Sequence, residues 1–202
     1  SPSCMSEEMD INAFFDAEFD EHLDLVDKTR EATRAPFAKL VSICTNALNE
    51  GNKLLFFGNG GSAADAQHIA TEFTVRYIND RRALPAIALT TDSSALTAIG
   101  NDFGFDYLFS RQIEALGRPG DVAIGISTSG NSRNVNLGLE KAREMGLIST
   151  GWTGKTGGAM VDLCDPLMIV PSNTTARIQE MHIQLGQMLV GALEHTLGLT
   201  KA

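Results

Sequence analysis

The chain has 202 residues, a formal net charge of −9 and no apolar run near the ~18 residues that cross a membrane. We therefore expect one domain that partners neither nucleic acid, which requires basic patches, nor a membrane. Three cysteines without metal-ligand spacing (Cys4, Cys44 and Cys164) and an acidic start without a signal-peptide pattern indicate a cytoplasmic protein rather than a secreted, disulfide-bonded one.

The N-terminal quarter of the chain has a helical pattern. Residues 1–50 are expected to form a helical segment packed on the same domain, with residues 1–4, ahead of Met5, interpreted as a cloning remnant. No glycine precedes Gly51, but Pro36 lacks a backbone donor and is expected to split the helix.

The stretch LLFFGNGGSAADAQHIATE, which begins at Leu54, is the most informative part of the sequence. Its apolar start predicts an interior strand of a parallel sheet. Gly60 and Gly61 permit positive φ angles and a close approach of the backbone to a ligand. Ser62 and Asp65 match a capping box, which predicts a helix start whose free N–H groups would face an anion.

Strand and helix patterns alternate along the rest of the chain. Further strands are expected at residues 85–89, 122–126, 147–152 and 167–170, and helices at residues 62–77, 105–116, 135–145 and 175–197. This alternation implies right-handed crossovers between parallel strands. The sequence therefore predicts an α/β protein, a three-layer αβα sandwich with a five-stranded parallel sheet.

Polar residues follow two of the predicted strands at the edge where such sheets bind ligands. The third strand runs into STSGNS and a helix start, and its hydroxyls form a candidate phosphate cradle: Ser127, Thr128, Ser129 and Ser132. An ordinary helix cap explains one Ser and the Gly of this loop, but not four hydroxyls. Asn101 and Asp102 follow the second strand, and they suit either the orientation of sugar hydroxyls or a surface loop.

Two residues of the first predicted helix could bind a metal or move a proton. His68 and Glu72 are four residues apart, share one helix face and can reach one divalent ion. A solvated helix-surface pair is the alternative interpretation. The neighbouring glycine turn and serine loop favour a functional site. A dinucleotide is disfavoured because the acidic residue that such a site requires comes too late, at Asp92.

Four segments resemble the sugar isomerase (SIS) domain of the phosphoheptose isomerases: GNGGSAADAQHIATEF, TAIGNDFGFDYLFSRQIEALG, GDVAIGISTSGNS and ARIQEMH. They match in order and spacing from about residue 51 onward, which implies a SIS domain over residues 51–202. The resemblance implies isomerisation of sedoheptulose 7-phosphate to D-glycero-D-manno-heptose 7-phosphate for bacterial surface polysaccharide. It also implies a phosphorylated seven-carbon sugar as ligand, a homotetramer with active sites between subunits, and often zinc.

The family's functional residues carry over by position. The resemblance implies that the sugar contacts Asn59, Gly60, Gly61, Asn101 and Asp102, and that the phosphate contacts Ser127, Thr128, Ser129 and Ser132. It assigns a metal to His68, Glu72 and Gln179, with Gln179 also at the substrate and Glu72 as the base. The chemistry agrees, because moving a carbonyl between C2 and C1 through an enediolate requires a proton shuttle and stabilisation of negative charge.

The last predicted helix departs from the family pattern. Gln187 stands where the family has a catalytic, metal-binding His, and a neutral amide is a poor zinc ligand and no acid or base. We therefore expect zinc to bind weakly or not at all, and activity to be reduced. His182 falls within an apolar arc and is expected to be a packed core residue. The adjacent strip is expected to form a subunit contact: Gln179, Ile183, Gly186 and Val190.

A non-catalytic SIS protein is the alternative function. It would sense a phosphosugar or bind a protein, as do the relatives that associate with a replication initiator and carry an ARIQEMH-like segment. Those relatives lack a carboxylate at the position of Glu72, which this chain retains. The sequence therefore favours the enzyme.

Overall fold

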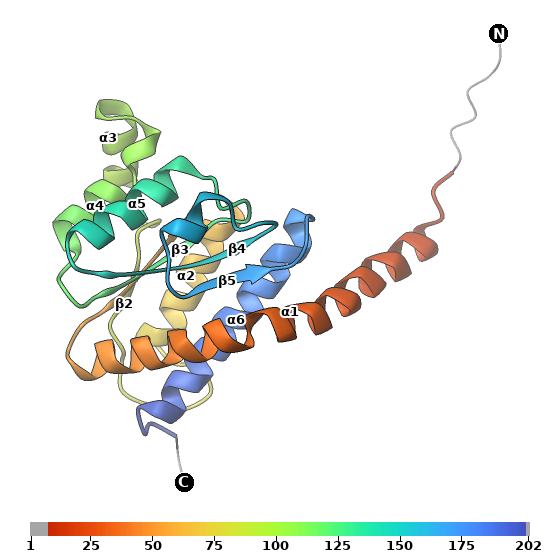
Figure 1. Ribbon diagram of the computed structural model, residues 1–202, viewed down its shortest axis with the longest axis horizontal. Coiled ribbons are helices and arrows are strands. Elements are labelled where there is room, and N and C mark those ends of the chain that lie inside the picture. The colour runs from red at the N-terminus through yellow and green to blue at the C-terminus, as the bar shows by residue number, and fades with distance from the viewer. Residues whose placement is uncertain (1–7, 201–202) are drawn as a thin grey trace.

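The computed structural model describes residues 8–200, which form a parallel sheet between two layers of helices (Figure 1). Its strands lie side by side in the order β2-β1-β3-β4-β5. Their bounds are Leu54–Gly58 for β1, Ala86–Ala88 for β2, Val122–Ile126 for β3, Ile148–Gly154 for β4 and Leu167–Val170 for β5. The five-stranded parallel sheet is thereby confirmed. The cloning remnant proposed at residues 1–4 lies outside the described residues.

Six α-helices occur in the described part of the chain. They are α1 (Ile11–Asn49), α2 (Gly61–Thr74), α3 (Ser93–Asp102), α4 (Ser110–Leu116), α5 (Arg133–Glu144) and α6 (Thr175–Thr196). Two short 3-10 helices, η1 (Phe105–Tyr107) and η2 (Gly158–Asp162), complete the elements. Helix α2 ends three residues earlier than the predicted helix.

The sheet divides the core into two parts. Helices α1, α2 and α6 pack on one face with Phe56 and Trp152, while α4 and α5 pack on the other with Phe57 and Ile113 (Figure 1). Neighbouring strand residues point to opposite faces, so the apolar run of β1 supplies both parts of the core. Full burial of each such side chain contributes about 1.5–3 kcal/mol to folding, which explains why this run has no polar member.

The prediction that the N-terminal helix splits near Pro36 was wrong. Helix α1 is 39 residues long and continues through Pro36, and its N-terminal part projects from the body in Figure 1. Its C-terminal part packs in the same core as α6, with Leu40 and Cys44 buried. Thr33 also donates its hydroxyl to the carbonyl of Thr29 at 2.7 Å, one turn before the proline. We attribute the continuity to this packing, which offsets the loss of one backbone hydrogen bond.

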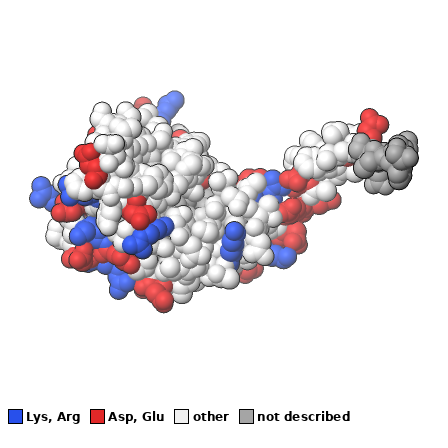
Figure 2. Space-filling model, turned by 90° about the horizontal axis from the view of Figure 1, so that it is seen from above, with Lys and Arg blue, Asp and Glu red and all other residues white. Residues whose placement is uncertain are grey.

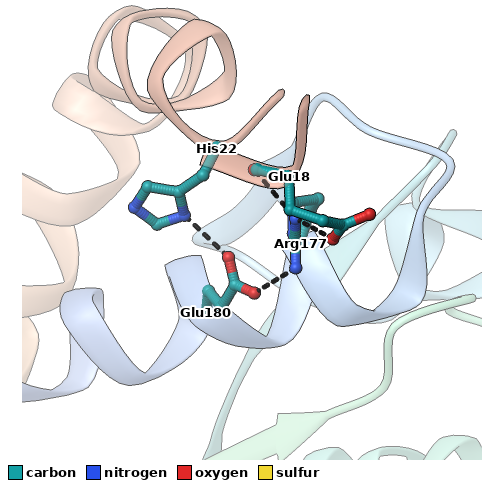
Figure 3. Close-up of polar contacts among 4 residues, drawn as sticks. All are labelled: Glu18, His22, Arg177 and Glu180. Atoms are coloured by element: carbon teal, nitrogen blue, oxygen red, sulfur yellow. Dashed lines mark hydrogen bonds and ion pairs between the residues drawn. The ribbon is translucent and has the colours of Figure 1, made fainter. Parts of the chain in front are cut away.

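Ion pairs fix the projecting part of α1 to the start of α6 (Figure 3). Arg177 donates to Glu18 Oε2 at 2.6 Å and to Glu180 Oε2 at 2.7 Å, and His22 Nδ1 lies 2.7 Å from Glu180 Oε1. All four side chains point toward one another between the two helices. This cluster therefore sets the place where α1 leaves the body.

The helix predicted at residues 105–116 was also wrong in part. Its first residues form η1, and only the remainder forms α4. Helix α3, which the sequence analysis missed, lies just before this region. Its signal was Asp92, whose carboxylate accepts from the backbone N–H of Ala95 at 3.0 Å and caps the helix.

Candidate active site

The turn after β1 leads directly into α2. Gly60 is the N-cap with a φ of 55°, as expected, but no side chain caps the helix. The predicted capping box was therefore wrong, although the helix begins within one residue of the predicted start. Ser62 lies buried inside the first turn, because the helix begins at Gly61 rather than after Ser62. The N–H groups of Ser62 and Ala63 donate to the carbonyl of Asn59 at 2.9 and 3.3 Å, so the first turn offers a ligand mainly the positive end of the helix dipole.

Asp65 takes no part in the cap and is instead partly buried in the helix. Its Oδ2 is buried without a hydrogen-bond partner. Burial raises the pKa of Asp65 to about 6, while the nearby His68 acts in the opposite direction. A carboxylate of this kind beside a candidate site was missed by the sequence analysis, which used Asp65 only as a capping residue.

The serine loop joins β3 to α5, with Ser132 at the N-cap of the helix. Ser127 donates its hydroxyl to Ser132 Oγ at 3.1 Å and accepts from the backbone N–H of Gly130 at 3.2 Å. Ser129 Oγ accepts from the backbone N–H of Asn131 at 3.1 Å. Gly130 has a φ of +72°, and a Cβ there would collide with the Gly157 carbonyl. The loop is thus a tight turn that gathers hydroxyls and N–H groups at a helix N-terminus.

The glycine turn and the serine loop lie next to each other. Strands β1 and β3 are neighbours, with Gly58 opposite Ile126 at their carboxyl ends. Beyond these ends, the amides of Asn59 and Asn134 donate to each other at 2.8 and 2.9 Å. Asn134 was not predicted as a site residue, because nothing in the sequence around the helix start indicates that its amide pairs with that of Asn59. This reciprocal pair fixes the spacing between the two loops.

The third part of the site lies between α2 and α6. His68 Nε2 is 3.5 Å from Glu72 Oε1 and 3.2 Å from the amide nitrogen of Gln187. Gln187 Oε1 is buried without a partner. His68 is exposed and Glu72 is half-buried. One chain therefore brings together a carboxylate, an imidazole and an amide on two facing helices.

The strip on α6 that was expected to form a subunit contact faces α2 instead. A Cβ on Gly186 would lie 2.6 Å from Ile69 Cγ1, and Val190 is fully buried. At the other end of the strip, a Cβ on Gly61 would lie 2.5 Å from Gln179 Nε2. The prediction was wrong because small residues that permit close packing serve helices of one chain as well as those of two.

The donor set fits a zinc site poorly. No group of three His, Cys, Asp or Glu residues that could hold a metal occurs within residues 8–200. The donors near one another are one imidazole, one carboxylate and the Gln187 amide, while Gln179 lies at the opposite end of α2 beside Gly61. Zinc sites in proteins are built mainly from Cys, His and carboxylate ligands. We therefore derive no chemical step through a metal.

Asn101 and Asp102 lie apart from these groups. They form the exposed end of α3, where the Asn101 amide donates to Asp102 Oδ1 at 3.0 Å. Figure 1 shows α3 at the end of the molecule farthest from α1. The structure brings the glycine turn and the serine loop together and places His68 and Glu72 farther along α2. It brings Asn101 and Asp102 to neither of these groups.

His182 is a core residue, as predicted. It is fully buried, its ring lies 6.4 Å from that of Trp152, and Nε2–H donates to the carbonyl of Thr153 at 2.9 Å. Burial lowers the pKa of His182 to about 4, although the bond to Thr153 acts in the opposite direction. The residue is therefore neutral at pH 7 and serves packing rather than chemistry.

Comparisons with known proteins agree with this geometry. A family model described as SIS domain matches residues 19–154. The phosphoheptose isomerase of Paramagnetospirillum magneticum is 58% identical over 186 residues, which cover 92% of this chain and 97% of that protein. The phosphoheptose isomerase of Aquifex aeolicus is 57% identical, and the match covers 77% of this chain and 81% of that one.

Solved structures give the same result. A phosphoheptose isomerase from Neisseria gonorrhoeae superposes with a TM-score of 0.87 at 41% identity, covering 92% of this chain and 99% of that one. These relatives are isomerases, which confirms the prediction of an enzyme over the non-catalytic alternative. With a SIS domain, a parallel sheet in the predicted arrangement and this identity over almost its whole length, the chain belongs to the phosphoheptose isomerase family.

Proposed function

We propose that the protein converts sedoheptulose 7-phosphate to D-glycero-D-manno-heptose 7-phosphate through an enediolate. The reaction would take place in the cytoplasm and supply heptose for bacterial surface polysaccharide. The observation that carries this proposal is a serine loop and a glycine turn side by side at the carboxyl ends of β1 and β3, with His68 and Glu72 farther along the helix that starts at this turn. These three parts match the three demands of the substrate: a phosphate, a row of hydroxyls and an acidic C–H bond.

The serine loop would bind the phosphate. Its hydroxyls (Ser127, Thr128, Ser129 and Ser132) and the N-terminus of α5 offer neutral donors and a positive dipole end, which suit a dianion without a lysine. The glycine turn would approach the sugar with its backbone, because Gly60 and Gly61 have no side chains in the way. We retain Asn59, Asn101 and Asp102 as sugar contacts, which for the last two requires that the substrate extend to α3.

Glu72 would move the proton between C1 and C2. Its carboxylate is half-buried at the α2–α6 contact, where the side chain is held near His68 rather than free in solvent. A carboxylate held in this way can remove a proton from one carbon and return it to its neighbour. His68, whose Nε2 lies 3.5 Å from Glu72 Oε1, would stabilise the charge that develops on the enediolate oxygen.

The test is to incubate the protein with sedoheptulose 7-phosphate and to follow aldose formation. Glu72→Gln keeps the shape of the side chain but removes the base, so we expect kcat to fall about 10²–10⁴-fold with little change in phosphate affinity. Glu50→Gln, on an exposed residue after α1, is the matched control and should leave kcat unchanged. Turnover of Glu72→Gln within a few-fold of the parent would remove Glu72 from this role.

We further propose that zinc binds weakly or not at all, and that turnover is reduced for the same reason. Of the two amides that the family pattern assigns to the metal, Gln187 lies beside His68, whereas Gln179 lies beside Gly61 at the other end of α2. Gln187→His would place an imidazole beside His68, and we expect it to raise both zinc occupancy and kcat. Gln184→His is the control, because Gln184 lies on the same helix but lines the groove toward α1. Stoichiometric zinc in the parent, measured by metal analysis, would contradict this proposal.

We also propose that the protein assembles with itself as a homotetramer. Apolar side chains along the projecting part of α1 are exposed: Ile11, Phe14, Phe15, Phe19 and Leu23. Figure 2 shows this arm with uncharged and acidic side chains side by side. A groove of about 420 Å³ between α1 and α6, lined by Val26, Phe37 and Met188, continues the apolar surface. An exposed stripe of this length is typical of a protein–protein contact.

Analytical ultracentrifugation tests the assembly. We expect a tetramer for the parent and smaller species for Phe15→Asp, because a charge in a buried apolar contact is costly. Val161→Asp changes an exposed apolar residue on the other helix layer and should leave the tetramer intact. A monodisperse monomer of the parent would refute the assembly.

A further inference from the structure

Arg81 lies buried between the two helices that carry the candidate site. It belongs to the segment between α2 and β2, and its side chain is only 2% exposed. Nη2 donates to the backbone carbonyl of Glu72 at 2.7 Å, and Nη1 donates to that of Phe73 at 2.8 Å. Both carbonyls belong to the last turn of α2, where they have no partner within the helix and carry partial negative charge. A guanidinium therefore caps α2 at the residue proposed as the proton shuttle.

The same guanidinium is bound to α6. Nε of Arg81 donates to Glu194 Oε2 at 2.9 Å, and Glu194 Oε1 accepts from the amide of Asn79 at 3.2 Å. The Glu194 side chain is 1% exposed. Glu194 lies seven residues, or about two helical turns, after Gln187, whose amide is next to His68. The end of α2 and the end of α6 are thus joined through two buried charges, and each side-chain nitrogen and oxygen of the pair has a hydrogen-bond partner.

Stability alone does not explain this pair. Desolvation of two buried charges largely cancels their attraction, so apolar residues of similar size could hold the helices together equally well. An arginine fork differs from an apolar contact in its direction, because its planar donors fix the angle and distance of each acceptor. Here the acceptors are the backbone of Glu72 and a carboxylate on the opposite helix.

We propose that Arg81 and Glu194 are positioning residues for Glu72. They fix the last turn of α2 against α6, and thereby the place of the Glu72 carboxylate relative to the sugar carbons. This inference rests on the proposed function, in which Glu72 moves the proton. The serine loop is held by β3 and α5 instead, so phosphate binding is independent of the pair.

The test compares Arg81→Met and Arg81→Lys with the parent in steady-state kinetics and in calorimetry with inorganic phosphate. A displacement of about 1 Å at a reacting group can cost 10²-fold, so we expect kcat to fall about 10- to 100-fold for Arg81→Met. KM and the Kd of phosphate should stay within about threefold. Arg81→Lys keeps the charge next to Glu194 but lacks the fork, so it should fold even if Arg81→Met does not, and should lose most of the same kcat.

The control is a second buried charge, which lies outside the contact between α2 and α6. Asp121 is 1% exposed and accepts from Lys53 Nζ at 2.7 Å, between the starts of β1 and β3. Asp121→Asn should lower the melting temperature without lowering kcat at temperatures where the variant is folded. If kcat depended only on general stability, Asp121→Asn would lower kcat as the Arg81 variants do.

A double-mutant cycle separates positioning from any independent effect of Arg81. In the Glu72→Gln background, Arg81→Lys should have almost no further effect on kcat, because the group that it positions is gone. An undiminished loss in that background, or an equal loss of phosphate affinity, overturns the proposal. Absence of turnover in the parent overturns the proposed function instead. In that case the positioning role is tested by the affinity for a phosphorylated hydroxamate that mimics the enediolate. We expect Arg81→Lys to bind it more weakly than the parent does, and equal binding by the two proteins overturns the positioning role.

Discussion

Moderate acidification should destabilise this protein because the unfolded chain binds a proton at His182, at pH values where most carboxylates are still ionised. The ring is fully buried beside Trp152, and burial lowers its pKa from 6.5 to about 4. In the unfolded chain the same ring binds a proton near pH 6.5. The pKa of His182 is lower in the folded protein than in the unfolded chain. The contribution of the neutral ring to the free energy of unfolding is therefore complete above about pH 6.5 and is lost as the pH falls toward 4.

The magnitude follows from the two pKa values. A difference of 2.5 units corresponds to about 3 kcal/mol once both states are protonated, and to about 1.4 kcal/mol at pH 5.5. His182→Gln removes the titrating group but keeps an amide that can donate toward the Thr153 carbonyl. The variant should be less stable than the parent at pH 8, and the gap should narrow by about 1.4 kcal/mol at pH 5.5.

Urea unfolding followed by tryptophan fluorescence measures this gap. Trp152 is the single tryptophan, and its ring lies 6.4 Å from that of His182, so the signal reports on the same part of the core. Parent and variant are compared at equal protein concentration, because assembly would make stability depend on concentration. If the free energy of unfolding changes equally with pH in both proteins, the neutral, buried state of His182 is wrong.

Four further substitutions test the site and the frame around it. Ser132→Ala should weaken binding of a phosphosugar by about 1.5–3 kcal/mol in calorimetry, and unchanged affinity would mean that the phosphate binds elsewhere. Gly130→Ala forces a side chain into a left-handed turn against the Gly157 carbonyl, so it should destabilise the protein by about 1–2 kcal/mol or more and weaken phosphate binding; a neutral effect would show that the loop is not tight. Gly61→Ala should displace the Gln179 side chain and raise KM, whereas an unchanged KM would remove Gln179 and this turn from the substrate site. Burial alone would raise the pKa of Asp121, but hydrogen bonds from Lys53, Asn52 and the Arg118 backbone outweigh it and lower the pKa. Asp121→Asn should therefore cost about 2–3 kcal/mol at pH 7, with the gap closing as the pH falls below about 4; a gap independent of pH would show that the charge of Asp121 does not stabilise the fold.

Local sequence determined the sheet and the two ligand-facing loops. The run Leu54–Phe57 has no polar residue, so it had to be a strand covered on both faces, and the third and fifth strands begin and end where their apolar runs do. The serine loop could be predicted because Gly and several hydroxyl residues directly after a strand indicate a turn followed by a helix start. The resemblance added the family and the candidate residues, which composition and periodicity could not supply.

Only the tertiary structure decided which surfaces meet. Pro36 reads as a helix break, yet packing of α1 against α6 carries the helix through it. The strip of Gln179 and Gly186 was predicted to be a subunit contact, yet it packs on α2. Small residues on a helix face indicate that another helix packs closely there, but they do not indicate which helix it is. Arg81 gives no signal in the sequence at all. Its place between Glu72 and Glu194 depends on where two helices end in space, and hydrogen bonds between distant segments leave no periodic pattern along the chain.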